Sequence, residues 1–262
     1  MIDYIDGNKF LEFVKTFGTS NGYKEILFTS NNSYQSAFNK AVMNPITKFI
    51  LITHHSDDPV TEEMFKRKPH NIKYWFGRNC EYSHPDLIPI PIGLQNEYGY
   101  NGADMKQQYF AENCKRWQNV KKRTDVVYCN WRNWVNPIRS TIIPIFDEIG
   151  IKYIWEDNVP NTEYWNRLAS FQFIVSPPGN HRGRALTADC HKTWEAIYMG
   201  CTPIVIDSPM YDEYPELPII KVKNYRDLTP KILESSLNKQ YNYEKSTMTY
   251  WKNRILEIYK NL

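Results

Sequence analysis

The segment formed by residues 171–208, FQFIVSPPGNHRGRALTADCHKTWEAIYMGCTPIVIDS, constrains the fold of this chain more than any other. Its first five residues are apolar and predict a short buried strand, which PPGN ends with residues that break regular structure. Helical spacing then runs from Asp189 to Met199 and stops at Gly200, and CTPIVI predicts a second buried strand. A strand, loop, helix and strand in this order form a βαβ unit, which binds ligands at the carboxyl ends of its strands.

Strands and helices alternate on both sides of a basic stretch at residues 121–123. Before it, the pattern predicts strands at 25–29, 48–53 and 73–76, helices at 33–42, 61–66 and 104–118, and a loop at 89–102. After it, strands are predicted around DVVYCNW, IKYIW and residues 219–222, with helices at IRSTIIPIFDEIG and at 162–169. Such alternation predicts parallel sheets with helices on their faces.

We therefore expect an α/β protein of two Rossmann-like, doubly wound domains that face a central cleft. The expected domains are residues 1–120 and residues 121–242. Residues 243–262 have helical spacing and are expected to form a C-terminal helix that packs back on the N-terminal domain.

Composition limits the ligand and the compartment. The formal net charge is only +3 and the basic residues are scattered, which argues against a nucleic-acid partner and fits a nucleotide better. Aromatic residues make up 15% of the chain, which suits binding of sugar rings as well as it suits ordinary core packing. Five cysteines without a CxxC pair argue against a zinc site and a disulfide framework. With no leader pattern and no apolar run of about 18 residues, we expect a soluble, cytoplasmic protein without an integral membrane segment.

SPPGN at residues 176–180 and DCHKTWEAIYMGCTPIV at 189–205 resemble the donor domain of exostosin-type glycosyltransferases of family 47, which have the GT-B fold. FILITHHSDDPVT and NCEYSHPDLIPIPIGLQN are similar to the acceptor half of small exostosin-like proteins, including some of large DNA viruses. The resemblance spans most of residues 49–206. Two departures are the longer loop HRGRALTA at residues 181–188 and Lys192, which stands where the family more often has arginine.

The resemblance implies transfer of a sugar from a nucleotide-sugar donor to a hydroxyl of a glycan or glycoprotein acceptor. It implies that residues 1–120 bind the acceptor and that residues 121–242 bind the donor. The implied donor is a UDP-sugar, such as UDP-xylose, UDP-glucuronate or UDP-galactose, and no tightly bound cofactor is implied. The viral relatives imply action in the host cytoplasm.

A transferase of this kind must neutralise the leaving diphosphate without a metal, and helix amides and basic side chains can do so. The helix is predicted to begin near Asp189 or Cys190, where its free amides would lie beside basic residues. These residues are Arg182, Arg184, His191 and Lys192. Arg184 and Lys192 are the favoured diphosphate ligands, and a solvated loop is the alternative for the arginines.

By resemblance, Glu195 binds the donor ribose, since a carboxylate accepts two hydroxyl hydrogen bonds at once; a surface glutamate is the alternative. Asn130 and Arg139 are expected to approach the diphosphate from the other side, with a structural role as an equal alternative. The remaining residues expected in the donor site are Ser176, Gly179, Asn180 and Thr193.

The acceptor half carries HHSDD at residues 54–58, directly after a predicted strand. An inverting transfer needs a base for the acceptor proton, and Asp57 is the expected base, with Asp58 and His55 as rivals. Asp57 could instead cap a helix that starts near Val60. Adjacent histidines on a strand point in opposite directions, and no Asp-x-Asp triplet follows a strand, so we expect no metal site.

Two alternatives to an inverting enzyme stay open. One is a retaining transferase of the same fold, which would not need Asp57 as a base. The other is a non-catalytic relative that binds glycan through its aromatic residues. A Rossmann dehydrogenase is excluded because no GxGxxG follows an early strand.

Overall fold

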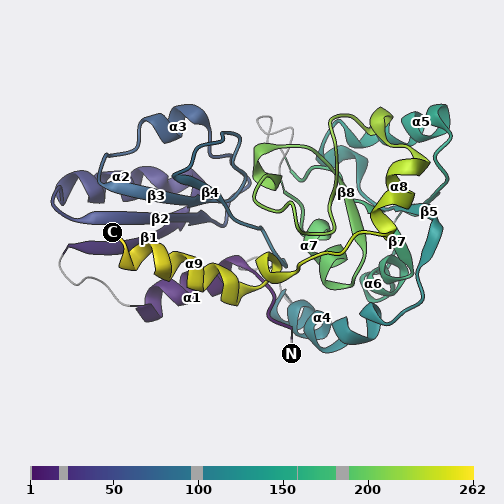
Figure 1. Ribbon diagram of the computed structural model, residues 1–262, viewed down its shortest axis with the longest axis horizontal. Coiled ribbons are helices and arrows are strands. Elements are labelled where there is room, and N and C mark those ends of the chain that lie inside the picture. The colour runs from purple at the N-terminus through teal and green to yellow at the C-terminus, as the bar shows by residue number, and fades with distance from the viewer. Residues whose placement is uncertain (1, 18–22, 96–102, 158, 181–188) are drawn as a thin grey trace.

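The computed structural model describes residues 2–17, 23–95, 103–157, 159–180 and 189–262. These residues form two separate parallel sheets, each flanked by helices (Figure 1). The protein is therefore α/β with two Rossmann-like halves, as the alternating pattern predicts. The division into domains at residues 120 and 242 stays a prediction.

The first sheet is built from residues 24–89. Its parallel strands are β1 (Lys24–Ser30), β2 (Lys48–His54), β3 (Ile72–Gly77) and β4 (Leu87–Pro89), in the order β1-β2-β3-β4. Each new strand is placed beside the previous one in the same direction across the sheet. A doubly wound sheet reverses this direction once, so the first sheet is not doubly wound as expected. The strand β4 begins before the predicted loop at 89–102 and was not expected.

Both faces of the first sheet are covered, because successive side chains of a strand point to opposite faces. Ile50 and Ile52 pack against α1 (Gly7–Phe17) and α9 (Met248–Lys260). Phe49 and Leu51 face α2 (Tyr34–Met43) and α3 (Glu62–Lys66) on the other side. The apolar run of β2 is thus buried throughout, as a central parallel strand requires.

The second sheet has the order β6-β5-β7-β8-β9. Its strands are β5 (Arg123–Cys129), β6 (Tyr153–Trp155), β7 (Phe171–Val175), β8 (Thr202–Ile206) and β9 (Ile220–Val222). Its helices are α5 (Arg139–Ile149), α6 (Asn161–Ala169), α7 (His191–Tyr198) and α8 (Pro230–Leu237). The chain places β6 on one side of β5 and then β7 on the other. The direction therefore reverses between β5 and β7, and this is the topological switch point where open α/β sheets bind ligands.

The helix α4 (Ala103–Gln118) and α9 connect the halves (Figure 1). Trp117 of α4 donates from Nε1 to Asn166 Oδ1 of α6 at 2.8 Å. The hydroxyl of Tyr259 in α9 donates to the carbonyl of Lys24 at 3.2 Å, at the start of β1. One buried core accordingly runs from the first sheet into the second. No helix in the described part of the chain combines the length and apolar character needed to cross a membrane.

Short 3-10 helices occupy several connections. They are η1 (Asn31–Ser33), η2 (Asn133–Val135), η3 (Pro209–Tyr211), η4 (Tyr225–Asp227) and η5 (Glu244–Ser246). Of these, η3 directly follows the carboxyl end of β8, beside the switch point.

Candidate functional site

The carboxyl ends of β5 and β7 carry the first group of candidate residues. Asn130 follows β5 and donates from Nδ2 to the carbonyl of Glu156 at 2.7 Å, which fixes the end of β5 to that of β6. Ser176 follows β7, and its hydroxyl lies 2.8 Å from the hydroxyl of Thr193 in α7. Both hydroxyl residues are buried. This hydrogen bond therefore connects the end of β7, just before the PPGN turn, to α7.

Side chains from the start of α5 and from the segment before it form hydrogen bonds with the backbone of the PPGN turn. Arg139, which is 7% exposed, donates from Nε and Nη2 to the carbonyl of Pro178 at 3.0 and 2.8 Å. Asn136 donates from Nδ2 to the carbonyl of Gly179 at 3.1 Å. These bonds shape the turn, so the guanidinium of Arg139 acts on the site through the backbone that it binds.

Lys192 and Glu195 lie three residues apart on α7, on the same helical face. Lys192 is 9% exposed and its ammonium stands 5.6 Å from the ring centre of Tyr164 in α6. Burial lowers the pKa of Lys192 from 10.5 to about 8. Glu195 is half-buried and forms a hydrogen bond with the side chain of Tyr164. A cation and a carboxylate thus lie on one face of α7, and Tyr164 contacts both.

Asp189 lies just before α7 and joins the two halves. Its carboxylate is buried and accepts four hydrogen bonds. The donors are Ile92 N at 3.0 Å, Trp194 Nε1 at 2.7 Å, Cys190 N at 2.8 Å and the Tyr211 hydroxyl at 3.2 Å. Burial raises the pKa of this carboxyl.

The two amides that precede α7 are occupied. The amide of Asp189 donates to Asn79 Oδ1 at 2.9 Å, and that of Cys190 donates to the carboxylate of Asp189. The predicted start of the helix near Asp189 or Cys190 is confirmed, with Cys190 at the N-cap. The amides of Asp189 and Cys190 are already bonded, so they are not available to an anion. Cys190 forms no side-chain cap, and the amide of Thr193 donates to the carbonyl of Cys190 at 2.9 Å. An anion at this helix would therefore use the amides of His191 and Lys192.

His191 is a neutral acceptor. Its Nδ1 lies 2.7 Å from the carbonyl of Gly93, which can only accept, so Nδ1 carries the proton and Nε2 is left with a lone pair. Burial, with the charge of Arg78, lowers the pKa of His191 to about 3. Gly93 has φ +67°, and a Cβ there would lie 2.0 Å from the carbonyl oxygen of Ile5, so only glycine brings this carbonyl into place. The lone pair on Nε2 can accept a hydrogen bond from a hydroxyl, whereas a phosphate oxygen is itself an acceptor and would need a donor.

Asp57 lies at the carboxyl end of β2 and meets the donor turn. Its Oδ1 accepts from Arg78 Nη2 at 3.0 Å, and its Oδ2 accepts from Asn180 Nδ2 at 3.2 Å. The alternative that Asp57 caps a helix is wrong, because Thr61 caps α3 by accepting from the amide of Met64. The structure therefore brings the expected base and the PPGN turn together.

The rivals of Asp57 have different surroundings. Asp58 accepts from the hydroxyl of Ser56 at 2.8 Å within its own turn. His55 has φ +57°, a conformation that is uncommon outside glycine, and burial lowers its pKa. His54 is buried, with Nε2 3.1 Å from the carbonyl of Pro91 and Nδ1 accepting from the amide of His55. His54 is therefore a structural residue.

Three residues near this site were not predicted: Arg78, Asn79 and Tyr164. Arg78 and Asn79 follow β3 directly, and Asn79 connects the carbonyl of Asp57 to the amide of Asp189. The rule applied to HHSDD, that polar residues after a buried strand form sites, also fits GRN at residues 77–79. Tyr164 carries no such signal, because its role depends on how α6 packs against α7.

Arg182 and Arg184, the other expected diphosphate ligands, lie outside the described residues. Within the described ranges, no group of three or more His, Cys, Asp and Glu side chains is arranged to hold a metal ion.

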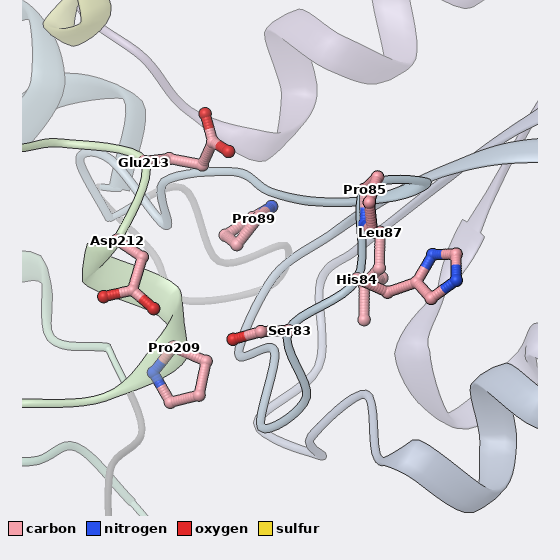
Figure 2. A pocket seen from close by; sticks show the side chains of 8 residues that line it. All are labelled: Ser83, His84, Pro85, Leu87, Pro89, Pro209, Asp212 and Glu213. Carbon is pink, nitrogen blue, oxygen red and sulfur yellow. The ribbon is translucent and has the colours of Figure 1, made fainter.

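A pocket of about 320 Å³ lies at the boundary of the halves, between the segment before β4 and the residues after β8 (Figure 2). It is lined by Ser83, His84, Pro85, Leu87, Pro89, Pro209, Asp212 and Glu213. Ser83 and Pro209 face each other across it, whereas the ring of His84 points away from Asp212 (Figure 2). The pocket therefore lies near the end of β8, and none of its lining residues comes from β5 or β7.

No protein-family model matches the sequence, and no curated protein matches it. Among solved structures, the UDP-GlcNAc 2-epimerase from Methanocaldococcus jannaschii is similar, with 13% identity and a TM-score of 0.33. The alignment covers 98% of this chain and 82% of that one.

Proposed function

We propose that this chain is a glycosyltransferase of the GT-B kind, similar to exostosins, which transfers a sugar from a nucleotide sugar to a hydroxyl of a glycan. The hydrogen bond between Asn180 and Asp57 carries the proposal. It places the turn at the switch point of the second sheet against a carboxylate at the end of β2. A transferase needs this arrangement, because donor and acceptor must meet in one place.

The donor would lie across the carboxyl ends of β5 and β7. Lys192 and the first turn of α7 would stabilise the negative charge of the diphosphate, without a metal ion. Glu195, oriented by Tyr164, would accept hydrogen bonds from the ribose hydroxyls. The lone pair on His191 Nε2 would accept from a hydroxyl of the transferred sugar. The exostosin resemblance favours a UDP-sugar as the donor.

The proposed reaction is a single inverting displacement. The acceptor hydroxyl oxygen attacks the anomeric carbon while Asp57 takes its proton, and the bond from the anomeric carbon to the diphosphate oxygen breaks. The electron pair of that bond leaves with the diphosphate, where Lys192 meets the added charge. Arg78 would hold Asp57 in position through the 3.0 Å ion pair.

The test is a panel of UDP- and GDP-sugars, scored for nucleotide release with and without glycan acceptors, on the wild type and on Glu195→Ala. We expect one UDP-sugar to be turned over by the wild type and not by the variant. No turnover together with no shift of the melting temperature by UDP would overturn the proposal. Glycan binding without UDP binding would instead identify a non-catalytic relative, and retention of the anomeric configuration would remove the role of Asp57 as base.

A further inference from the structure

The amino-terminal ends of β1, β2 and β3 form one continuous surface, made by residues 23–24, 39–48 and 67–73, which we call the basic-apolar face. The amide of Lys48 donates to the carbonyl of Tyr23 at 2.8 Å, and the amide of Phe49 donates to the carbonyl of Asn71 at 2.7 Å. The face lies at the left end of Figure 1, far from the second sheet. Because the strands are parallel, it is opposite the ends that carry Asp57.

Four large apolar side chains are exposed on this face: Tyr23 (66%), Val42 (66%), Met43 (80%) and Ile46 (73%). The backbone of the turn that carries Val42, Met43 and Ile46 is fixed by Asn71, which is buried. Its Nδ2 donates to the carbonyls of Ala41 at 2.9 Å, Asn44 at 3.1 Å and Thr47 at 3.0 Å. The fold therefore holds the turn between α2 and β2 rigidly, with its apolar side chains directed to solvent.

The same face is strongly basic. Its basic side chains are Lys24, Lys40, Lys48, Arg67, Lys68 and Lys73. Residues 23–24, 39–48 and 67–73 include no Asp or Glu, and the adjoining Glu25 is buried and paired with Lys40. Arg67 also pairs with Glu63 of α3. Lys24 donates to the carbonyls of Tyr259 and Lys260 at the end of α9, and Lys48 donates to the backbone oxygen of Leu262. Lys68 donates to the carbonyl of Ile72 at 2.8 Å. Within the described residues, none of these three lysines, nor Lys73, has an ion pair with an Asp or Glu side chain. Positive charge is thus concentrated here, in a chain whose net charge is only +3.

We propose that the basic-apolar face binds to the surface of an anionic lipid bilayer. Apolar side chains surrounded by lysines match such a surface, because the former enter the acyl boundary while the latter meet the lipid phosphates. Four side chains are too few for a stable dimer, which buries about 800 Å² of each partner. A nucleic-acid backbone would satisfy the lysines and would leave Met43 and Ile46 in water. Binding through this face would leave the candidate site at the opposite ends of the strands open to solvent.

The experiment is co-sedimentation of the whole chain with vesicles of phosphatidylcholine, with and without phosphatidylserine. We expect binding only to vesicles that contain phosphatidylserine, weakened by added salt. The double variant Met43→Ser/Ile46→Ser should bind about tenfold more weakly, because it loses two inserted side chains. Lys48→Glu/Lys73→Glu should lose binding as well. Leu237→Ser, a matched change of an exposed apolar residue on α8, should bind like the wild type.

Melting temperatures of all variants show whether each is folded, and UDP binding is measured in parallel as an independent property. Absence of binding by the wild type would overturn the proposal, as would equal binding to neutral vesicles. Unchanged binding of both double variants would place any lipid contact elsewhere and would also overturn it. A dimer seen by sedimentation velocity, or binding to RNA, that is lost in Met43→Ser/Ile46→Ser without vesicle binding would show a different partner.

Discussion

Asn180 donates from Nδ2 to Oδ2 of Asp57 at 3.2 Å, and through this hydrogen bond the turn after β7 meets the loop after β2. The other oxygen of the same carboxylate is bound by Arg78 at 3.0 Å. Asp57 is therefore oriented from both sheets, although its side chain is still about one-third exposed. That remaining exposure leaves room for an acceptor hydroxyl to approach.

Asp57→Asn should remove the base and keep the volume of the side chain, while its single amide oxygen can accept from only one of Arg78 and Asn180. We expect kcat to fall by about 10²- to 10⁴-fold, the range for loss of a general base, with UDP affinity unchanged. Product formation and calorimetry measure the two effects separately. Asp58→Asn is the control and should retain most activity. If Asp58→Asn or His55→Gln lost more activity than Asp57→Asn, the base would be the other residue.

UDP binding should depend on the protonation of Lys192. Burial lowers its pKa to about 8, and a bound diphosphate favours the charged form, so binding should take up a proton near pH 8 and weaken as the pH rises above it. Calorimetry in buffers of different ionisation enthalpy measures this uptake. Lys192→Met should bind UDP at least about tenfold more weakly and show no proton uptake. Lys152→Met, a change of an exposed lysine, should leave both quantities as they are. Uptake that persists in Lys192→Met would contradict this assignment.

The same lowered pKa has a consequence for stability. Between about pH 8 and 10.5 the unfolded chain binds the proton of Lys192 and the folded protein does not, so the free energy of unfolding should rise with pH in this window. Below it, both states are protonated and the cost of burying the charge is fully present. Lys192→Met should therefore stabilise the ligand-free protein at neutral pH, by about 1–3 kcal/mol. Urea denaturation at several pH values measures this, and a variant less stable than the wild type at every pH would refute it.

Glu195→Gln tests recognition of the ribose. A carboxylate accepts from two hydroxyls, whereas an amide offers one oxygen, so we expect about tenfold weaker UDP binding. The wild type should also prefer UDP over 2′-deoxy-UDP or 3′-deoxy-UDP, and this preference should largely disappear in the variant. Glu163→Gln, on the exposed side of α6, serves as the control. Equal preference in the wild type and Glu195→Gln would show that Glu195 does not contact the ribose.

The βαβ unit at residues 171–206 could be predicted because its signals are local. Apolar runs, the PPGN break and the glycine at 200 each act within a few residues. The same holds for α5, which ends at Gly150 with φ +70°, as expected of a helix-ending glycine.

The junction between the halves could not be predicted, because it depends on distant partners. Asp189 binds the amide of Ile92, 97 positions away, and the side chain of Asn79, 110 positions away. No local pattern indicates such pairs. The order of the strands in each sheet could not be predicted for the same reason, because it depends on how the connecting helices pack against the sheet.

Asp189→Asn should destabilise the whole protein, because an amide cannot accept all four hydrogen bonds that the carboxylate accepts. We expect a loss of about 2–4 kcal/mol in the free energy of unfolding, since buried donors are left without partners. Asp212→Asn, at an exposed ion pair with Lys221, should cost far less. Urea denaturation of both variants measures the difference. Equal stability of the two would mean that Asp189 does not hold the halves together.

A crystal structure with UDP bound tests the central claim most directly. We expect the diphosphate at the start of α7 within hydrogen-bond distance of Lys192, and the ribose hydroxyls on Glu195, at the switch point between β5 and β7. UDP bound away from α7, or no UDP at concentrations that saturate nucleotide-sugar enzymes, would contradict the account.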